Sequence, residues 1–280
     1  MKALIVGCGN VGLSVAQLWR NQGHMVWGTT TTESKLDGLA QQLDKVFLCT
    51  GSDRKQLAEL ASQVDVVVVS VAPPLKKSIT PAQRQQIYKS VLVDTCENVS
   101  YVHERCIFLS SFSVYGDGGE GSDPVDELTP LTENQDASPM NYQLAERHIL
   151  ATPKGVVLRL PDIYGAPGDL DYAERLKFSW QYMAGKVPFS AEAPLYRIHY
   201  QDVVRAVDHV IKQDLVGVFN VCENKSVPPS NATVFDRFSK DLGMEPLTFL
   251  GHIKAPNRKI SSTKFCDTGF QLQYDPLVFT

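Results

Sequence analysis

The sequence predicts an α/β fold: a Rossmann-type, doubly wound parallel sheet with a small C-terminal α/β cap. Three observations predict it. Short apolar runs alternate with helix-periodic segments from the start of the chain. A glycine-rich turn joins the first run to the first helix, and the run at 65–70 is apolar without alternation, as in a strand that helices cover on both faces. We expect a Rossmann domain over 1–165 and a smaller cap over 166–280, interleaved with it and packed on it.

The elements follow in order along the chain. Six segments have the length and composition of strands, at 3–6, 25–29, 46–49, 65–70, 106–110 and 156–160. Apolar residues recur at helical spacing over 11–22 and 83–98. Prolines at 73, 74 and 81 bracket a loop after the fourth strand, and a glycine- and acid-rich loop spans 116–130. The looser pattern beyond residue 160 predicts helices near 172–183, 201–212 and 233–242 and a strand at 218–221.

Composition excludes several classes of function. The net charge of −4 and the lack of any basic run argue against a nucleic-acid or anionic-membrane partner, which would need a concentrated basic surface. The first apolar run is too short for a signal peptide or a membrane span, so we expect a cytoplasmic protein. The six cysteines are scattered without a CxxC pair, so we expect no metal site.

The turn after the first strand has the pattern GxGxxG. Gly7 permits the tight turn, Gly9 lets the backbone approach a pyrophosphate, and Gly12 lets the helix pack against the strand. Asn10 and Val11 open that helix, whose N-terminus attracts phosphate. The context of strand, turn and helix therefore predicts a site for NAD or NADP.

The end of the second strand bears on the choice between these two cofactors. An acidic residue there would bind the ribose diol of NAD, and an arginine would pair with the extra phosphate of NADP. The chain has neither, but Thr30 and Thr31 lie in a run of four threonines that can donate to a phosphate without repelling it. We therefore expect a slight preference for NADP. Asp53, after the third strand, either approaches the adenine or caps the helix that follows.

Four ordered segments resemble the extended short-chain dehydrogenases/reductases, the NAD-dependent epimerase/dehydratase family. They are CIFLSSFSVYG at 106–116, VVLRLPDIYG at 156–165, RIHYQDV at 197–203, and FNV at 219–221 with Pro228 after it. The first resembles the family's SSxxVYG segment, the second LRxxxxYGP and the third RIHVDD. The resemblance covers nearly the whole chain. GxGxxG in place of GxxGxxG is typical of atypical members described as nucleoside-diphosphate-sugar epimerases.

The resemblance implies roles for individual residues. It implies that Ser111 polarises a substrate carbonyl or alcohol. We expect Val71 and Ser110 to contact the cofactor. The expected substrate contacts are Ser111, Ser113, Tyr115 and Arg197.

The family's YxxxK motif is broken in this chain. In one register Tyr142 is the catalytic tyrosine and Glu146 stands at the lysine position; in the other, Ser138 stands at the tyrosine position and Tyr142 at the lysine position, where it would contact the cofactor. A phenol with a pKa of about 10 is a poor base unless a cation stabilises the phenolate. We therefore consider three substitutes for the missing acid or base: Tyr115, Tyr164 and His199.

Two hypotheses of function follow. The first is an NAD(P)-dependent oxidoreductase or epimerase that acts by hydride transfer on a sugar-like alcohol or carbonyl, with or without a linked nucleotide. Cap cations that could neutralise a diphosphate are Arg175, Arg197, Arg258 and Lys259. The second is a non-catalytic NAD(P)-binding regulator on a reductase scaffold. The resemblance also implies that a homodimer can form through helices 83–98 and 141–150.

Overall fold

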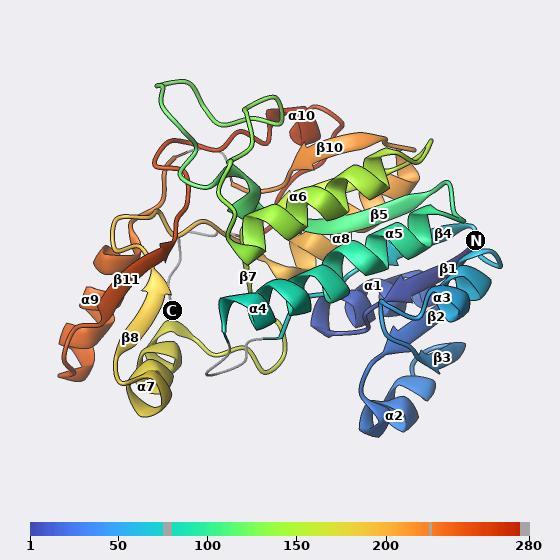
Figure 1. Cartoon of the computed structure of the whole chain (residues 1–280), viewed down its shortest axis with the longest axis horizontal. Helices are drawn as coiled ribbons and strands as arrows, with labels where there is room; N and C mark the ends of the chain where they lie inside the picture. The colour runs from blue at the N-terminus through green and yellow to red at the C-terminus, as the bar shows by residue number, and fades with distance from the viewer. Residues whose placement is uncertain (75–79, 224–225, 275–280) are drawn as a thin grey trace.

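The computed structural model describes residues 1–74, 80–223 and 226–274. Its centre is a seven-stranded sheet in the order β10-β6-β5-β4-β1-β2-β3, and all neighbouring strands are parallel (Figure 1). The strands are β1 (Lys2–Val6), β2 (Met25–Thr30), β3 (Lys45–Leu48), β4 (Val66–Val69), β5 (Cys106–Ser111), β6 (Val156–Leu160) and β10 (Gly217–Asn220). The order reverses between β1 and β4, as in a doubly wound sheet, so the predicted fold class is confirmed.

Helices cover both faces of this sheet (Figure 1). On one face lie α1 (Asn10–Asn21) and α8 (Tyr200–Lys212). On the other lie α3 (Arg54–Ala61), α4 (Pro81–Tyr88), α5 (Asp94–Ser100) and α6 (Ala137–Leu150). The short α2 (Leu36–Ala40) leads into β3. The helix predicted over 83–98 is interrupted, because a π-helical turn at Lys89–Val93 joins α4 to α5.

Burial on both faces follows from the composition of the central strands. Ala3 and Ile5 of β1 pack in the core shared with α1 and α8, whereas Leu4 and Val6 pack in the core shared with α3, α5 and α6. The four valines of β4 are fully buried. A strand with apolar side chains on both faces is stable only between two layers of helices, and this confirms the interpretation of 65–70 as a central strand.

The cap is built on a two-stranded parallel sheet of β8 (Lys186–Phe189) and β11 (Thr248–Ile253). Two amphipathic helices, α7 (Tyr172–Met183) and α9 (Asn231–Leu242), pack on it. Their shared core contains Tyr172, Leu176, Val187 and Phe235. The remaining elements are β7 (Asp162–Tyr164), which pairs in parallel with β9 (Arg197–His199), and the short α10 (Thr263–Cys266).

The two parts of the chain are interleaved. After α7 and β8, the chain returns to the large sheet, where α8 packs against α1 and β10 completes the edge beside β6. Trp19 of α1 donates to Asp208 of α8 over 3.1 Å, which ties these two helices together. The residues that form the cap therefore come from segments on both sides of α8 and β10. The boundary near residue 165 stays a prediction.

The sequence also led to expectations about membrane spans, metal sites and the proline-bracketed loop. No helix among the described residues is long and apolar enough to cross a membrane. Over the same ranges, no cluster of three or more His, Cys, Asp or Glu side chains is arranged to hold a metal ion. Most of the proline-bracketed loop, residues 75–79, lies outside the described residues.

Candidate functional site

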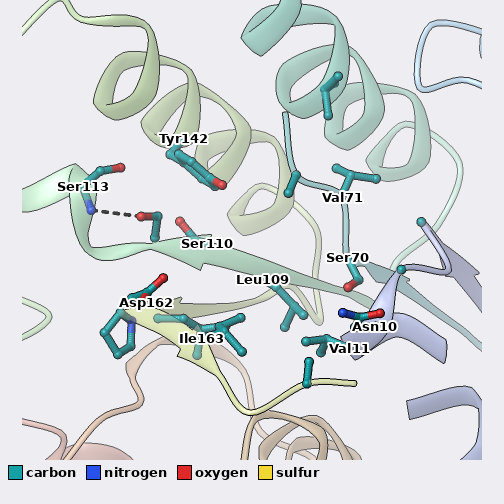
Figure 2. A pocket seen from close by; sticks show the side chains of 18 of the residues that line it. Asn10, Val11, Ser70, Val71, Leu109, Ser110, Ser113, Tyr142, Asp162 and Ile163 are labelled. Carbon is teal, nitrogen blue, oxygen red and sulfur yellow. Dashed lines mark hydrogen bonds between the residues drawn. The ribbon is translucent and has the colours of Figure 1, made fainter. Parts of the chain in front are cut away.

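A cavity of about 890 Å³ lies at the carboxyl edge of the large sheet, between that sheet and the cap. The glycine turn, the ends of β2, β4 and β5, one side of α6, β7 and the cap all contribute to its walls. Figure 2 shows Asn10 and Val11 at one end of the view and Ser113, Tyr142 and Asp162 at the other. Ligands bind at this position in doubly wound folds, because the strand order reverses there and leaves a crevice.

The three glycines of the turn differ in their surroundings. A Cβ at Gly7, whose φ is +93°, would lie 2.7 Å from the carbonyl oxygen of Ser70. A Cβ at Gly12 would lie 2.4 Å from the carbonyl oxygen of Gly7, within the turn itself. At Gly9 a Cβ would meet no described atom within 4 Å. Gly7 and Gly12 are therefore required by the fold, whereas Gly9 leaves open space for a ligand.

The glycine turn is held against β2. The Thr29 hydroxyl accepts a hydrogen bond from the N–H of Gly7 over 3.1 Å. Helix α1 begins at Asn10, and within the described residues no side chain caps it, so its first N–H groups are left for a ligand. A helix N-terminus with free N–H groups at the wall of a cavity is suited to bind an anion.

The end of β2 contributes hydroxyls and one cation. Thr30, Thr31 and Thr32 line the cavity together with Lys35, which the sequence interpretation did not single out. Lys35 could have been identified from its position, four residues beyond Thr31 in the turn before α2. Asp53 is not part of the lining: its carboxylate accepts the N–H of Gln56 over 3.1 Å and caps α3, which is the second of the two roles considered for it.

The end of β5 brings the predicted serines to the cavity. Ser110, Ser111 and Ser113 all line it, as does Val71 after β4. The Ser111 hydroxyl accepts the N–H of Ser113 over 3.1 Å (Figure 2). The Ser113 hydroxyl in turn accepts from the hydroxyl of Ser138, 3.1 Å away on α6.

Tyr142 is the residue of α6 that faces the cavity (Figure 2). Its ring stacks on Phe108 of β5 with a centroid distance of 6.0 Å and an interplanar angle of 26°. Burial raises the pKa of the Tyr142 hydroxyl above its usual value of about 10, and the nearby Tyr88 and Cys96 raise it further. Among the described residues that line the cavity, the only lysines or arginines are Lys35 and Lys254. The Tyr142 hydroxyl is therefore protonated at neutral pH.

Glu146 points away from the cavity, into a buried network. It accepts a hydrogen bond of 2.5 Å from Ser110 and forms an ion pair with Arg159 of β6. The shortest contact, between Arg159 Nη2 and Glu146 Oε2, is 2.8 Å, and both side chains are less than 5% exposed. A carboxylate engaged in this way serves to position Ser110 and the end of β5.

Two residues that we expected to contact the substrate lie elsewhere. Tyr115 is buried, donates to Asn220 over 2.7 Å and accepts from Arg159 over 2.8 Å, so it belongs to the network around Glu146. Burial raises the pKa of Tyr115 to about 12. Arg197 is also buried, with its guanidinium 4.4 Å from the centre of the Tyr164 ring. Neither residue is part of the cavity lining, because each fills the core beneath it.

The other candidates from the sequence also lie outside the lining. Tyr164 and His199 contact each other edge-on, with their ring centroids 5.2 Å apart, and neither lines the cavity. Arg175 pairs with Asp162 over 2.8 Å, and Arg258 donates to the carbonyl oxygens of Gly118 and Asp123. The cavity instead exposes Asp162 and Lys254, which sequence reasoning missed. Asp162 could have been identified from the sequence, because it lies inside the family-like segment 156–165.

Comparison with solved structures shows similar folds. WbmG from Bordetella bronchiseptica, in complex with NAD, has a TM-score of 0.75 at 21% identity, covering 98% of this chain and 90% of that one. UDP-glucose 4-epimerase from Thermus thermophilus, in complex with NAD, has a TM-score of 0.76 at 16% identity, covering 98% and 95%. UDP-glucose 4-epimerase from Thermotoga maritima, with UDP-glucose, has a TM-score of 0.72 at 17% identity, covering 98% and 94%.

The sequence comparisons agree with the resemblance. No curated protein matches the chain. The sequence pattern of the NAD-dependent epimerase/dehydratase family matches residues 3–222, which include the glycine turn, the SSFSVYG segment and β10. This chain therefore belongs to the NAD-dependent epimerase/dehydratase family.

Proposed function

We propose that this protein is an NAD(P)-dependent oxidoreductase or epimerase that acts on a sugar-like alcohol or carbonyl by hydride transfer. One observation carries the proposal: a single cavity runs from the glycine turn to Ser111, Ser113 and Tyr142 and on to the cap. A dinucleotide bound along the turn would bring its nicotinamide toward the serines, and a substrate would lie between them and the cap. Family membership and the similar folds of nucleotide-sugar epimerases support it.

The donors in the site suit reduction of a carbonyl. The bound cofactor supplies or accepts the hydride. Ser111 lies at the end of β5 where it can donate to a carbonyl oxygen, and Tyr142 keeps its proton because burial raises its pKa. A carbonyl oxygen gains negative charge as hydride reaches its carbon, and donors aimed at that oxygen stabilise the transition state.

The proposed cofactor is NADP(H) in preference to NAD(H). Thr30, Thr31, Thr32 and Lys35 surround the place after β2 where the adenosine ribose of a bound dinucleotide would lie. A lysine there attracts a 2′-phosphate, and Glu33 in the same turn is not part of the lining. The neighbouring structures contain NAD, so this preference would distinguish the chain from them.

The decisive experiment combines binding with turnover. The purified protein is titrated with NADPH and NADH by fluorescence, and then mixed with a panel of sugars, sugar phosphates and nucleotide sugars while absorbance at the nicotinamide wavelength is followed. We expect tighter binding of NADPH and oxidation of the reduced cofactor by at least one carbonyl substrate. Lys35→Met should weaken NADPH binding about tenfold and leave NADH binding unchanged, since one charge-assisted hydrogen bond is lost.

One observation favours the second candidate function, a non-catalytic NAD(P)-binding regulator. Tyr142 has no lysine or arginine beside it among the described residues of the cavity wall, and Glu146 is committed to the buried network. A family member without the activated tyrosine can still bind a dinucleotide, because the glycine turn is intact. Tight dinucleotide binding with neither net hydride transfer nor an epimerised product, detected by NMR, from any compound of the panel would support this candidate over the enzyme.

A further inference from the structure

The cap side of the cavity is mostly apolar. Its wall contains Phe189, Leu195, Tyr196 and Ile253, with Asn231 among them. The Tyr196 hydroxyl donates to the carbonyl oxygen of Arg258, so this ring presents its carbon edge rather than a free hydroxyl. Aromatic and aliphatic walls of this kind suit the C–H faces of a small hydroxylated ring or chain, and leave little polar surface for a nucleotide.

Lys254 is the one cation on this side of the cavity among the described residues. It follows Ile253 at the end of β11, and its ammonium group lies 3.5 Å from the carboxylate of Asp117. Both side chains are more than half exposed, 57% for Lys254 and 54% for Asp117. An ion pair in that setting is weak, so the ammonium group can move from Asp117 to the anionic group of a ligand at small cost.

The three arginines of the cap region that could neutralise a diphosphate are already engaged and do not line the cavity. Arg175 is paired with Asp162, Arg258 holds two carbonyl oxygens of the 117–123 loop, and Arg197 lies beneath Tyr164. A diphosphate carries two charges that proteins usually neutralise with arginine pairs or several N–H donors. In the described part of the cap, the cavity offers one exposed ammonium group instead.

Two carboxylates, those of Asp162 and Asp169, also line the cavity. Asp162 shares its charge with Arg175, and Asp169 accepts the N–H of Ala166 over 2.9 Å. These carboxylates can accept hydrogen bonds from sugar hydroxyls.

From this arrangement we propose that the substrate is a hydroxylated carbonyl or alcohol compound with a single anionic group, held by Lys254, and not a nucleotide diphosphate sugar. The anionic group is a carboxylate or a phosphate monoester, since an ammonium group binds either. This inference rests on the proposed function, because it names the substrate class of the same cavity. It differs from what the nucleotide-sugar epimerases of similar fold bind.

The experiment uses four probes that share one sugar. Glucose, glucuronate, glucose 6-phosphate and UDP-glucose are titrated into the full chain saturated with NADP⁺, and binding is followed by ligand-observed NMR and calorimetry. We expect at least one of the two singly substituted anionic sugars to bind more tightly than glucose and than UDP-glucose. The comparison of glucuronate with glucose 6-phosphate tells a carboxylate from a phosphate monoester.

Variants then test the role of Lys254. Lys254→Met should weaken binding of the preferred anionic sugar about tenfold, and Lys254→Arg should retain most of it. Asp117→Asn should strengthen binding, because it frees the ammonium group. The matched control is Lys240→Met, which removes an exposed lysine of α9 that does not line the cavity and should change nothing.

Three results would overturn the inference. One is UDP-glucose binding more tightly than both anionic sugars. The second is binding of neither anionic sugar above the level of glucose. The third is weaker binding of the preferred anionic sugar in a Lys76→Met, Lys77→Met double variant together with unchanged binding in Lys254→Met. These two lysines lie outside the described residues. Failure of the proposed function is a separate outcome, seen either as absence of NADPH and NADH binding or as dinucleotide binding without turnover of any compound in the panel described above.

Discussion

Gly9 is the residue of the glycine turn whose role can be tested without disturbing the fold. A Cβ there meets no described atom within 4 Å, and a side chain would occupy the space in which the pyrophosphate of a dinucleotide is expected to approach the backbone. We expect Gly9→Asp to fold with an unchanged melting temperature and to lose NADPH affinity at least tenfold, because its carboxylate also repels phosphate. Fluorescence titration and thermal melting measure the two quantities on one sample.

Gly12→Ala is the contrasting variant. Its Cβ would lie 2.4 Å from the carbonyl oxygen of Gly7, a backbone atom that cannot move without opening the turn. This variant should lose stability, with a melting temperature several degrees lower. The result that would contradict the Gly9 prediction is NADPH affinity in Gly9→Asp equal to that of the natural protein. The turn would then not be the dinucleotide site.

Tyr142 should act as a proton donor and not as a phenolate base. Its pKa is raised by burial, so its hydroxyl remains protonated at every pH below about 10. For a carbonyl substrate, kcat/KM should therefore be flat between pH 7 and 9, and Tyr142→Phe should lower it about hundredfold, the lower range for general acid catalysis. A rise of kcat/KM with an apparent pKa near 7 that disappears in Tyr142→Phe would show a phenolate base instead.

At the scale of elements, the buried ion pair of Glu146 and Arg159 joins α6 to β6 and, through Ser110, to β5. Removing one partner leaves the other charge buried without compensation, which costs about 3 kcal/mol or more. We expect Glu146→Gln to lower the free energy of unfolding by roughly 3 kcal/mol in urea denaturation.

Its control is an ion pair at the surface. Lys154 lies 3.3 Å from Asp214, and their side chains are 48% and 60% exposed, so Lys154→Met should cost less than about 1 kcal/mol. If the free energy of unfolding falls by the same small amount in both variants, the network does not hold α6, β6 and β5 together. A Glu146→Gln protein that stays folded but loses turnover would show that the network also positions the serines at the end of β5.

At the scale of the whole molecule, two histidines predict how stability changes with pH. Burial lowers the pKa of both His199 and His209. A group whose pKa is lowered by folding binds protons less readily in the folded state, so its contribution is present above the unfolded pKa of about 6.5 and is lost as pH falls. His199 Nδ1 also accepts the N–H of Gln201 at the start of α8, a bond that protonation of that nitrogen removes.

We therefore expect the free energy of unfolding to fall between pH 7.5 and pH 5.5. Urea denaturation at several pH values measures it, and His209→Gln should make the dependence shallower. A stability that is constant or rises over this interval would contradict the prediction. The homodimer through α4, α5 and α6 stays a prediction at this scale, and sedimentation of the purified protein tests it.

Much of the fold was predictable because its signals are local. The lengths of β1, β4 and α7 follow from runs of apolar residues and their period, and the glycine turn follows from three positions within six residues. The interruption between α4 and α5 was missed, since a π-helical turn leaves the helical period of the sequence almost unchanged. The cavity residues at the ends of β2 and β5 were predicted for the same reason, because strand ends meet at one edge of a parallel sheet.

By itself, the sequence determined the strands β1 to β6, the glycine turn after β1 and the family to which the chain belongs. Only the tertiary structure decided that Tyr115 and Glu146 belong to a buried network. Asn220, the partner of Tyr115, is 105 residues away in the chain, and Arg159, the partner of Glu146, lies on a different element. It also decided that Lys35 and Lys254 reach one cavity from opposite ends of the chain. The physical reason is that which way a side chain points, and what meets it, depends on packing between segments that no local pattern relates.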